Sequence, residues 1–418
     1  MTVPNTPTTS NAAPSSPAAL PTTLQPPRKY GIGFWMIAGA FLTAMAFNAV
    51  PTPLYPLYQA QDGFGTLMVT VVFSVFAAGV GVGLVLLGHI SDWVGRKKIL
   101  IPALILEALS AAVFLAFPEL PGLLIGRLIG GVGIGMISAT ATAYLKDLHT
   151  VRRHDAGSGL FEIVSTGANV GGLALGPLIA GALAQYVGAP LRVPYIVFGI
   201  LLLLALVAVA CTPETVTELL SRPTYRPQRI SADHGDRSGF IAAAASGFVA
   251  FAVNGVYTSL SAGFVAGTLH RSSVLLAGTV AFALFAAATL SQLLAGRLPL
   301  RTQQALGIGG EAVGLVLLMV GIQSANLAIF LIAGVVCGAG VGVSIKYAIG
   351  MVAAMAAPAK RGEALAGLFL VCYAGMSVPT VGVGIAAHFI PLTGAMYGFC
   401  GTLFLVLAAV AVLVRRVP

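Results

Sequence analysis

Twelve apolar stretches, each long enough to cross a lipid bilayer, follow one another along the 418-residue sequence. A membrane-spanning helix needs about 20 consecutive residues of this kind. Helices are the spanning form that fits these stretches, because each helix satisfies its own backbone hydrogen bonds inside lipid. We therefore expect an all-α integral membrane protein, with helices at about 33–57, 65–89, 98–117, 121–145, 157–187, 193–211, 239–267, 273–296, 304–322, 325–356, 363–388 and 392–414.

The scarcity of charge supports a membrane protein, since only 8% of the residues are charged and 57% are hydrophobic. A soluble domain carries about 25% charged residues. The net charge of +9 does not indicate a nucleic-acid partner, because the basic residues form scattered pairs in short loops. The four cysteines lie in apolar runs without a Cys-x-x-Cys or a suitable His spacing, so we expect neither disulfides nor a metal site.

Two polar segments divide the chain into regions. Residues 1–29 are rich in Pro, Ser, Thr and Ala and have too few large apolar residues for a core, so we expect a disordered cytoplasmic tail. The longest polar gap, residues 212–238, separates two groups of six apolar runs. We therefore expect a six-helix bundle over 30–211, a central cytoplasmic loop over 212–238, and a second six-helix bundle over 239–418.

The positions of Lys and Arg predict the orientation in the membrane. With twelve spans, 18 of these residues fall on one side, and only Arg192 and Arg271 fall on the other. Basic loops remain in the cytoplasm, so both termini are expected there. The frequent Ala, Gly and Arg are typical of a GC-rich bacterium, which indicates a location in a bacterial plasma membrane.

The two groups of runs resemble each other at an offset near 208, which indicates an internal repeat. At this offset Gly88 corresponds to Gly296, and Asp92 corresponds to Leu300, so the charged motif is not kept in the second copy. The other correspondences are Gly159-Leu160-Phe161 with Gly367-Leu368-Phe369, Gly167 with Gly375, and, at offset 207, residues 131–135 with 338–342.

Residues 88–98 concentrate charges in a short turn between two membrane-length runs. Asp92 and Arg96 are four residues apart and face each other if the turn is helical. Gly88 and Gly95 allow close backbone approach or a positive φ. The segment resembles the loop between helices 2 and 3 of the major facilitator superfamily, with pattern G-x-L-x-D-R-x-G-R-K/R. The matching residues are Gly88, Asp92, Gly95, Arg96 and Lys97, whereas Ile90 and Trp93 replace the Leu and the first Arg.

This resemblance implies two pseudo-symmetric six-helix halves, with a substrate site between them near the middle of the membrane. Asp147, at the cytoplasmic end of the fourth run, matches an acid that the superfamily often has there. Together with Asp92 and Arg96 it would form a conformational latch, closed in one state and broken in the other.

Arg127 begins a segment that resembles the superfamily's helix 4 motif, R-x-x-x-G-x-G. In proton-coupled exporters of the superfamily this Arg is linked to proton transfer, since a fixed cation favours ionisation of a nearby carboxyl. A permanent salt bridge is the structural alternative. Glu162, about two turns into the fifth run, is either the titrating carboxyl or a partner for the Asp92–Arg96 pair.

The fifth run resembles the motif G-x-x-x-G-P-x-x-G-G of the drug and small-molecule exporters, with Ala180 in place of one Gly. The matching residues are Gly172, Gly176, Pro177 and Gly181. Pro177 removes a backbone hydrogen bond, and the two glycines form a face for close helix contact. The resemblance implies that this helix seals the path against leakage, which favours export over import.

Neutral and basic side chains are the candidates for lining the substrate cavity. Lys346 and Tyr347 lie midway along the tenth run, where Lys346 either contacts an anionic group or pairs with Glu311. The first run has no acidic residue. For Glu107 in the third run, a structural hydrogen bond or ion pair is favoured over a role in proton coupling. Asn48, Tyr55, Asn254 and Tyr257 either line the cavity or hydrogen-bond across helices.

These features favour a proton-coupled exporter of small amphipathic molecules, working by alternating access as a monomer in the lipid bilayer. The alternatives are a proton-coupled importer and a non-transporting receptor or scaffold on the same fold. The sequence has no phosphate-binding loop, so we expect neither an ATP-driven pump nor an enzyme, and no cofactor beyond the proton gradient. Arg127 and Lys346 without an acid in the first run favour anionic, zwitterionic or neutral solutes.

Overall fold

A computed structural model describes residues 28–88, 90–152, 159–216, 237–357 and 360–415. All the regular elements in these ranges are helices, and twelve are long and apolar enough to span a membrane. The expected all-α fold with twelve spans is therefore confirmed. Most of the expected tail (1–27) and of the central loop (217–236) lies outside the described residues.

The first span is interrupted near its end by closely spaced prolines. Pro51 and Pro53 have no N–H to donate, and a 3₁₀ turn joins the two helical pieces of the span. The first helix begins at Arg28, inside the expected tail. The elements of this half are α1 Arg28–Ala49, η1 Thr52–Leu54, α2 Tyr55–Asp62, α3 Thr66–Leu87, α4 Ser91–Val94, α5 Arg96–Ala116, α6 Leu120–Arg152, α7 Gly159–Tyr186 and α8 Val193–Cys211.

The second half consists of six long helices whose bounds agree with the expected ones within a few residues. They are α9 Arg237–Gly267, α10 Val274–Ala295, α11 Leu300–Gln323, α12 Leu327–Met355, α13 Arg361–Phe389 and α14 Leu392–Arg415.

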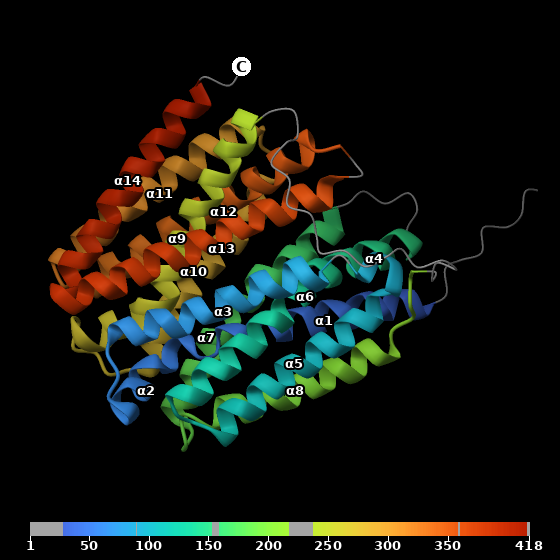
Figure 1. The fold of residues 1–418 in the computed structure, drawn as a ribbon, viewed down its shortest axis with the longest axis horizontal. Coiled ribbons are helices and arrows are strands. Elements are labelled where there is room, and N and C mark those ends of the chain that lie inside the picture. The colour runs from blue at the N-terminus through green and yellow to red at the C-terminus, as the bar shows by residue number, and fades with distance from the viewer. Residues whose placement is uncertain (1–27, 89, 153–158, 217–236, 358–359, 416–418) are drawn as a thin grey trace, which may run out of the picture.

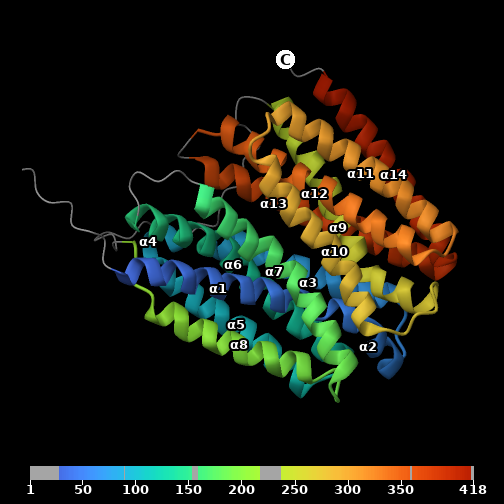
Figure 2. The ribbon, with the colours of Figure 1, turned by 180° about the vertical axis from the view of Figure 1, so that it is seen from behind.

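The helices gather into two groups, α1–α8 and α9–α14, each around its own apolar core (Figure 1). The groups meet mainly where α7 packs against α10 and α3 packs against α13, as both views show (Figure 2). We call the side of the molecule that carries residues 55–62 the α2 end, and the opposite side, which carries residues 91–94, the α4 end.

Glycine contacts repeat between the halves and confirm the internal repeat for two helix pairs. In each half, two glycines of one helix lie directly on carbonyl oxygens of its neighbour, where a larger side chain would not fit. The contacts are Gly131 with Phe76, Gly135 with Val80, Gly338 with Leu284, and Gly342 with Ala288. Accordingly, α3 and α10 begin and end 208 residues apart.

Two of the expected correspondences are wrong. Gly375 lies on the Phe248 carbonyl of α9, as Gly172 and Gly176 lie on carbonyls of α1, whereas Gly167 has no such contact and so is not the counterpart of Gly375. Arg96 and Leu300 each begin a helix, so Leu300 does not correspond to Asp92. The four-residue helix α4, which carries Asp92, has no counterpart between α10 and α11.

Candidate functional site

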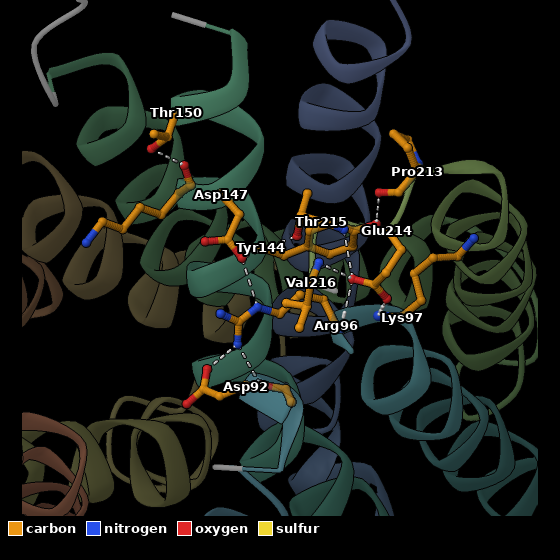
Figure 3. Close-up of polar contacts among 12 residues, drawn as sticks. Asp92, Arg96, Lys97, Tyr144, Asp147, Thr150, Pro213, Glu214, Thr215 and Val216 are labelled. Carbon is orange, nitrogen blue, oxygen red and sulfur yellow. Dashed lines mark hydrogen bonds and ion pairs between the residues drawn. The ribbon is translucent and has the colours of Figure 1, made fainter. Parts of the chain in front are cut away.

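Arg96 is the centre of a polar cluster at the α4 end, together with Ser91, Asp92 and Asp147 (Figure 3). Its Nε donates to Asp147 Oδ2 at 3.0 Å, its Nη1 donates to Ser91 Oγ at 2.9 Å, and Nη1 also contacts Asp92 Oδ1. Arg96 is only 8% exposed, whereas the Asp92 side chain is 67% exposed. We refer to these four residues as the Arg96 cluster.

The turn that builds this cluster is a short helix followed by a break, and Asp92 and Arg96 contact each other across that break. Helix α4 ends at Val94, and Gly95 has a φ of +116°, which side-chain-bearing residues rarely adopt. A Cβ atom at Gly95 would also lie 2.9 Å from Glu214. Gly88 has an ordinary helical φ of −60°, so only Gly95 needs the freedom of glycine in its backbone angle.

Glu214 is a member of this region for which the sequence predicted no contact. Its carboxylate accepts from the Arg96 and Lys97 backbone N–H groups at 3.1 and 3.0 Å, and so caps the start of α5 (Figure 3). It also accepts from the backbone N–H groups of Thr215 and Val216. The Pro213-Glu214-Thr215 segment after α8 is thereby tied to the Arg96 cluster.

All the described contacts of the Arg96 cluster stay within the N-terminal half. They come from α4, α5, α6 and the segment after α8. Lys97 points away from the cluster and donates to the Ala210 carbonyl at 2.6 Å. The expected latch between conformations therefore remains a prediction, and in this conformation the cluster braces one half.

Arg127 lies in the interior of the N-terminal half and is 3% exposed. Its guanidinium donates to the Asn48 carbonyl at 2.8 Å and to the Tyr55 hydroxyl at 2.5 Å, and it lies over the Phe76 ring. Its Nε has no acceptor among the described residues. Two of the expected cavity residues, Asn48 and Tyr55, thus hold Arg127 at the break in the first span.

The glycine and proline motif of α7 serves two different contacts. Gly172 and Gly176 face the backbone of α1 in the same half. The Pro177 carbonyl lies on Gly278 of α10, and Gly181 lies on the α10 backbone at Val274, so this face meets the other half. The motif therefore lets three helices approach closely at the α2 end.

A side-chain cap strengthens the contact of the two halves at the α2 end. Gln185, near the end of α7, accepts from the Val274 backbone N–H at 3.0 Å and from the Ser273 hydroxyl at 3.3 Å. These donors form the start of α10. In addition, Gly384 of α13 lies directly on the Thr70 side chain of α3. The α2 end is closed by these contacts.

Glu162 and Lys346 form an ion pair between the halves. Lys346 Nζ of α12 lies 3.4 Å from Glu162 Oε2 of α7, and the side chains are 29% and 46% exposed. Glu162 lies in the first turn of α7 as described, closer to the helix start than expected. The structure thus pairs Lys346 with Glu162, whereas Glu311, the partner that the structural alternative offered for Lys346, is fully buried on α11.

Comparison with protein families matches residues 36–301 to the Major Facilitator Superfamily. The chain belongs to this superfamily. A 177-residue segment is 28% identical to the multidrug resistance protein MdtL of Klebsiella pneumoniae and covers 42% of each chain. A 145-residue segment is 27% identical to the bacillibactin exporter of Bacillus subtilis, over 33% of this chain and 35% of the relative. A 94-residue segment is 38% identical to the arabinose-proton symporter of the same species, over 22% of this chain and 19% of the relative. Each of these matches spans less than half of the relative.

Solved structures of superfamily transporters share the fold over nearly the whole chain. The human organic anion transporter MFSD10 gives a TM-score of 0.64 at 16% identity, over 92% of this chain and 100% of that one. A bacterial homologue of the human lysosomal transporter Spinster gives a TM-score of 0.69 at 14% identity, over 94% of this chain and 98% of that one. At these identities the likeness concerns the fold alone.

Three expected cavity residues of this superfamily member lie inside its C-terminal half. Tyr257 packs against Phe330 and lines a small apolar cavity among α9, α11, α12 and α14. Asn254 is 9% exposed, and Tyr347 belongs to a buried cluster of α9, α12 and α13. Among the residues that the structure describes, no group of His, Cys, Asp and Glu is arranged to hold a metal ion.

Proposed function

We propose that this transporter exports small amphipathic molecules in exchange for protons by alternating access. The observation that carries the proposal is the close contact of α7 with α10, made by the exporter-like motif on one side and Gly278 on the other. A seal at this place lets one end stay shut while the other exchanges solutes. The names of the relatives, an exporter and a multidrug resistance protein, agree with export.

Alternating access requires contacts that form in one conformation and separate in the other. The α2 end is closed here by Gly181, Gly278, Gly384 and Gln185. The Lys346–Glu162 pair would break or form as the halves tilt, because its two members belong to different halves. We propose the Arg96 cluster as the element that sets the balance between the two conformations from the α4 end.

Proton-driven import is the second candidate, favoured by the match to an arabinose-proton symporter. A scaffold without transport is disfavoured by the contacts between the halves, since a scaffold needs no bistable interface. Flux of a dye through proteoliposomes that responds to an imposed pH gradient would separate a transporter from a scaffold.

We place the protein in a bacterial plasma membrane as a monomer, with both termini and the α4 end in the cytoplasm. Arg96, Lys97, Arg301 and Lys360 lie at or next to the helix starts on that side, where the basic residues of cytoplasmic ends gather. The proton gradient is the energy source in this proposal. Arg127 and an internal carboxyl couple protons to the conformational change. The sequence pattern indicates Glu162 for this carboxyl, but in this conformation Glu162 is paired with Lys346.

Lys346 is the residue that we propose to recognise the charge of the substrate. Its ammonium lies between the halves and is partly exposed, and its partner Glu162 belongs to the other half. A solute anion can replace the Glu162 carboxylate when the halves separate, because an isolated cation within the membrane is costly. The transporter should therefore prefer anionic and zwitterionic solutes over cations.

A matched dye series tests this preference. The rhodamines share one ring system and include a cationic ethyl ester, the zwitterionic rhodamine B and the anionic sulforhodamine B. We expect Lys346→Ala to lower sulforhodamine B flux about tenfold, since a hydrogen bond to a charged group contributes about 1.5–3 kcal/mol. Flux of the cationic ester should change much less. The measurement is dye flux in proteoliposomes.

Lys360→Ala, which removes an exposed lysine just before α13, is the matched control and should leave all three fluxes unchanged. Equal loss of all three dyes in Lys346→Ala would contradict the assignment. So would recovery of sulforhodamine B flux in the double variant Lys346→Ala with Glu162→Gln, because Lys346 would then be only the partner of Glu162.

A further inference from the structure

Two carboxyl groups are completely buried within the membrane spans, Glu107 on α5 and Glu311 on α11. Neither oxygen of the Glu107 carboxyl has a hydrogen-bond partner among the described residues, and the polar group near the Glu311 carboxyl is the Ser344 hydroxyl. A buried carboxylate in this condition is costly, because it has lost water and gained no donor. Each carboxyl therefore either holds a proton or needs a cation close by.

The two carboxyls are counterparts in the internal repeat. The first residues of α5 and α11 are 204 positions apart in the sequence, and Glu107 and Glu311 are separated by the same 204 positions. The Glu107 carboxyl lies against Gly133 of α6, and the Glu311 side chain lies against Gly340 of α12, which is the glycine that corresponds to Gly133 at offset 207. The same acid thus occupies the same place in each half.

The surroundings of the two carboxyls differ by one cation. The Glu107 carboxyl lies beside Gly130 of α6, three residues after Arg127 on the same helix, so the positive charge of Arg127 acts on it. At offset 207 the position of Arg127 is taken by Gly334, and the Tyr257 ring lies beside that glycine. Near Glu311 the polar group is the Ser344 hydroxyl. Only Glu107 therefore has a cation that can stabilise its ionised form.

Arg127 in turn connects Glu107 to the contact between the halves. The guanidinium is bonded here to the neutral groups of Asn48 and Tyr55 and has an unused Nε. These groups flank η1, and η1 packs against α9 and α10 of the other half. If Arg127 moved toward Glu107, it would lose its hydrogen bonds to Asn48 and Tyr55, which hold the broken part of the first span in place.

We propose that Glu107 binds and releases the coupling proton, and that Arg127 changes its bonding partners when Glu107 becomes charged. Glu311, the repeat-related carboxyl, keeps its proton throughout. This inference rests on the proposed proton-coupled transport and names the carboxyl. When the O–H bond of Glu107 breaks, the proton passes to water on the open side and the negative charge stays on the carboxylate. Arg127 then leaves Asn48 and Tyr55 to pair with Glu107, which loosens η1 at the α2 end. Rebinding of a proton restores the arrangement seen here.

The other polar groups on helices packed against α5 do not duplicate the role of Arg127. Helix α8 contributes Tyr195, whose hydroxyl accepts from Tyr58 at 3.1 Å. The charged residues of α1, Arg28 and Lys29, lie at the start of that helix. Ser110, one turn from Glu107, donates to the Gly126 carbonyl.

Infrared difference spectra between acidic and alkaline buffer test the proposal without any substrate. The wild-type protein in proteoliposomes should show a protonated-carboxyl band that disappears as pH rises. Glu107→Gln should lack this band, whereas Glu311→Gln, the matched control at the repeat-related site, should keep it. Persistence of the band in Glu107→Gln, or its loss in Glu311→Gln or Glu162→Gln, would overturn the assignment.

Arg127→Gln provides a test that keeps Glu107 in place, in case Glu107→Gln does not fold. Removing the cation should move the disappearance of the band to higher pH, and an unmoved band would contradict the role of Arg127. In a flux assay with sulforhodamine B, Glu107→Gln should retain dye exchange but lose the response to a pH gradient. A protein that moves no dye but shows the expected bands would refute the proposed transport and leave the proton site standing.

Discussion

Gly278→Val should nearly abolish transport while leaving the protein inserted and folded. A side chain at this position of α10 would collide with the Pro177 carbonyl of α7, which is backbone and cannot rotate away. The collision exists only when the α2 end is closed, so the variant should be held with that end open. Overpacking costs about 1–3 kcal/mol, which lowers the closed population about 5- to 150-fold.

The control for this prediction is Gly382→Val on α13, because Gly382 is exposed and has open space around it. Gly384→Val, two residues away and against Thr70, should behave like Gly278→Val. Spin labels on cysteines at Tyr186 and His270, with the four natural cysteines replaced by Ser, report the separation of the halves at the α2 end. Wild type and Gly382→Val should both show a short-distance population, and Gly278→Val should lack it. A short distance in Gly278→Val would show that the close contact is not needed for closure.

Asp92→Asn should lower transport about tenfold with almost no loss of stability. The Asp92 side chain is 67% exposed, and exposed ion pairs contribute only about 0–1 kcal/mol to folding. It nevertheless orients Arg96 at the start of α5, after the turn that follows α3, and α3 packs against α13 of the other half. In the proposed latch this charge meets the other half when the α4 end closes, and a coupling of about 1–3 kcal/mol corresponds to 5- to 150-fold.

Glu119→Gln is the matched control for Asp92→Asn, since Glu119 is an exposed acid in a loop at the α2 end. Initial rates of dye flux and thermal unfolding temperatures are measured on the same preparations. Unchanged flux in Asp92→Asn would remove the Arg96 cluster from the conformational balance. A fall in flux that merely follows a fall in unfolding temperature would do the same.

The number of spans and the two-half plan were predictable because hydrophobic runs of fixed length carry that information directly. The arrangement of Asp92, Arg96 and Asp147 was also within reach, since the motif loop is short and leaves few geometries. The residues of the α7 motif were predictable as contact points, but not that one face meets α1 and the other meets α10.

The rest depends on how each helix is rotated about its own axis, which a single sequence does not determine. Tyr257 turns into the core of its own half, and Lys346 reaches Glu162 rather than Glu311. The contact of Glu214 with the start of α5 was not predictable, because it depends on where the segment after α8 lies. The repeat relation of Glu107 and Glu311 was hidden by a difference in loop length. The connection between α10 and α11 is shorter than the connection between α3 and α5, which carries α4, so the offset changes from 208 to 204.

The most direct test of proton-coupled export is dye movement in inside-out membrane vesicles with an acidic lumen, assayed with all three rhodamines. We expect protein-dependent accumulation of sulforhodamine B in the lumen, driven by protons leaving it and stopped when a protonophore collapses the gradient. No protein-dependent uptake of any rhodamine, or acid-driven release of preloaded dye from the lumen, would contradict export by proton exchange.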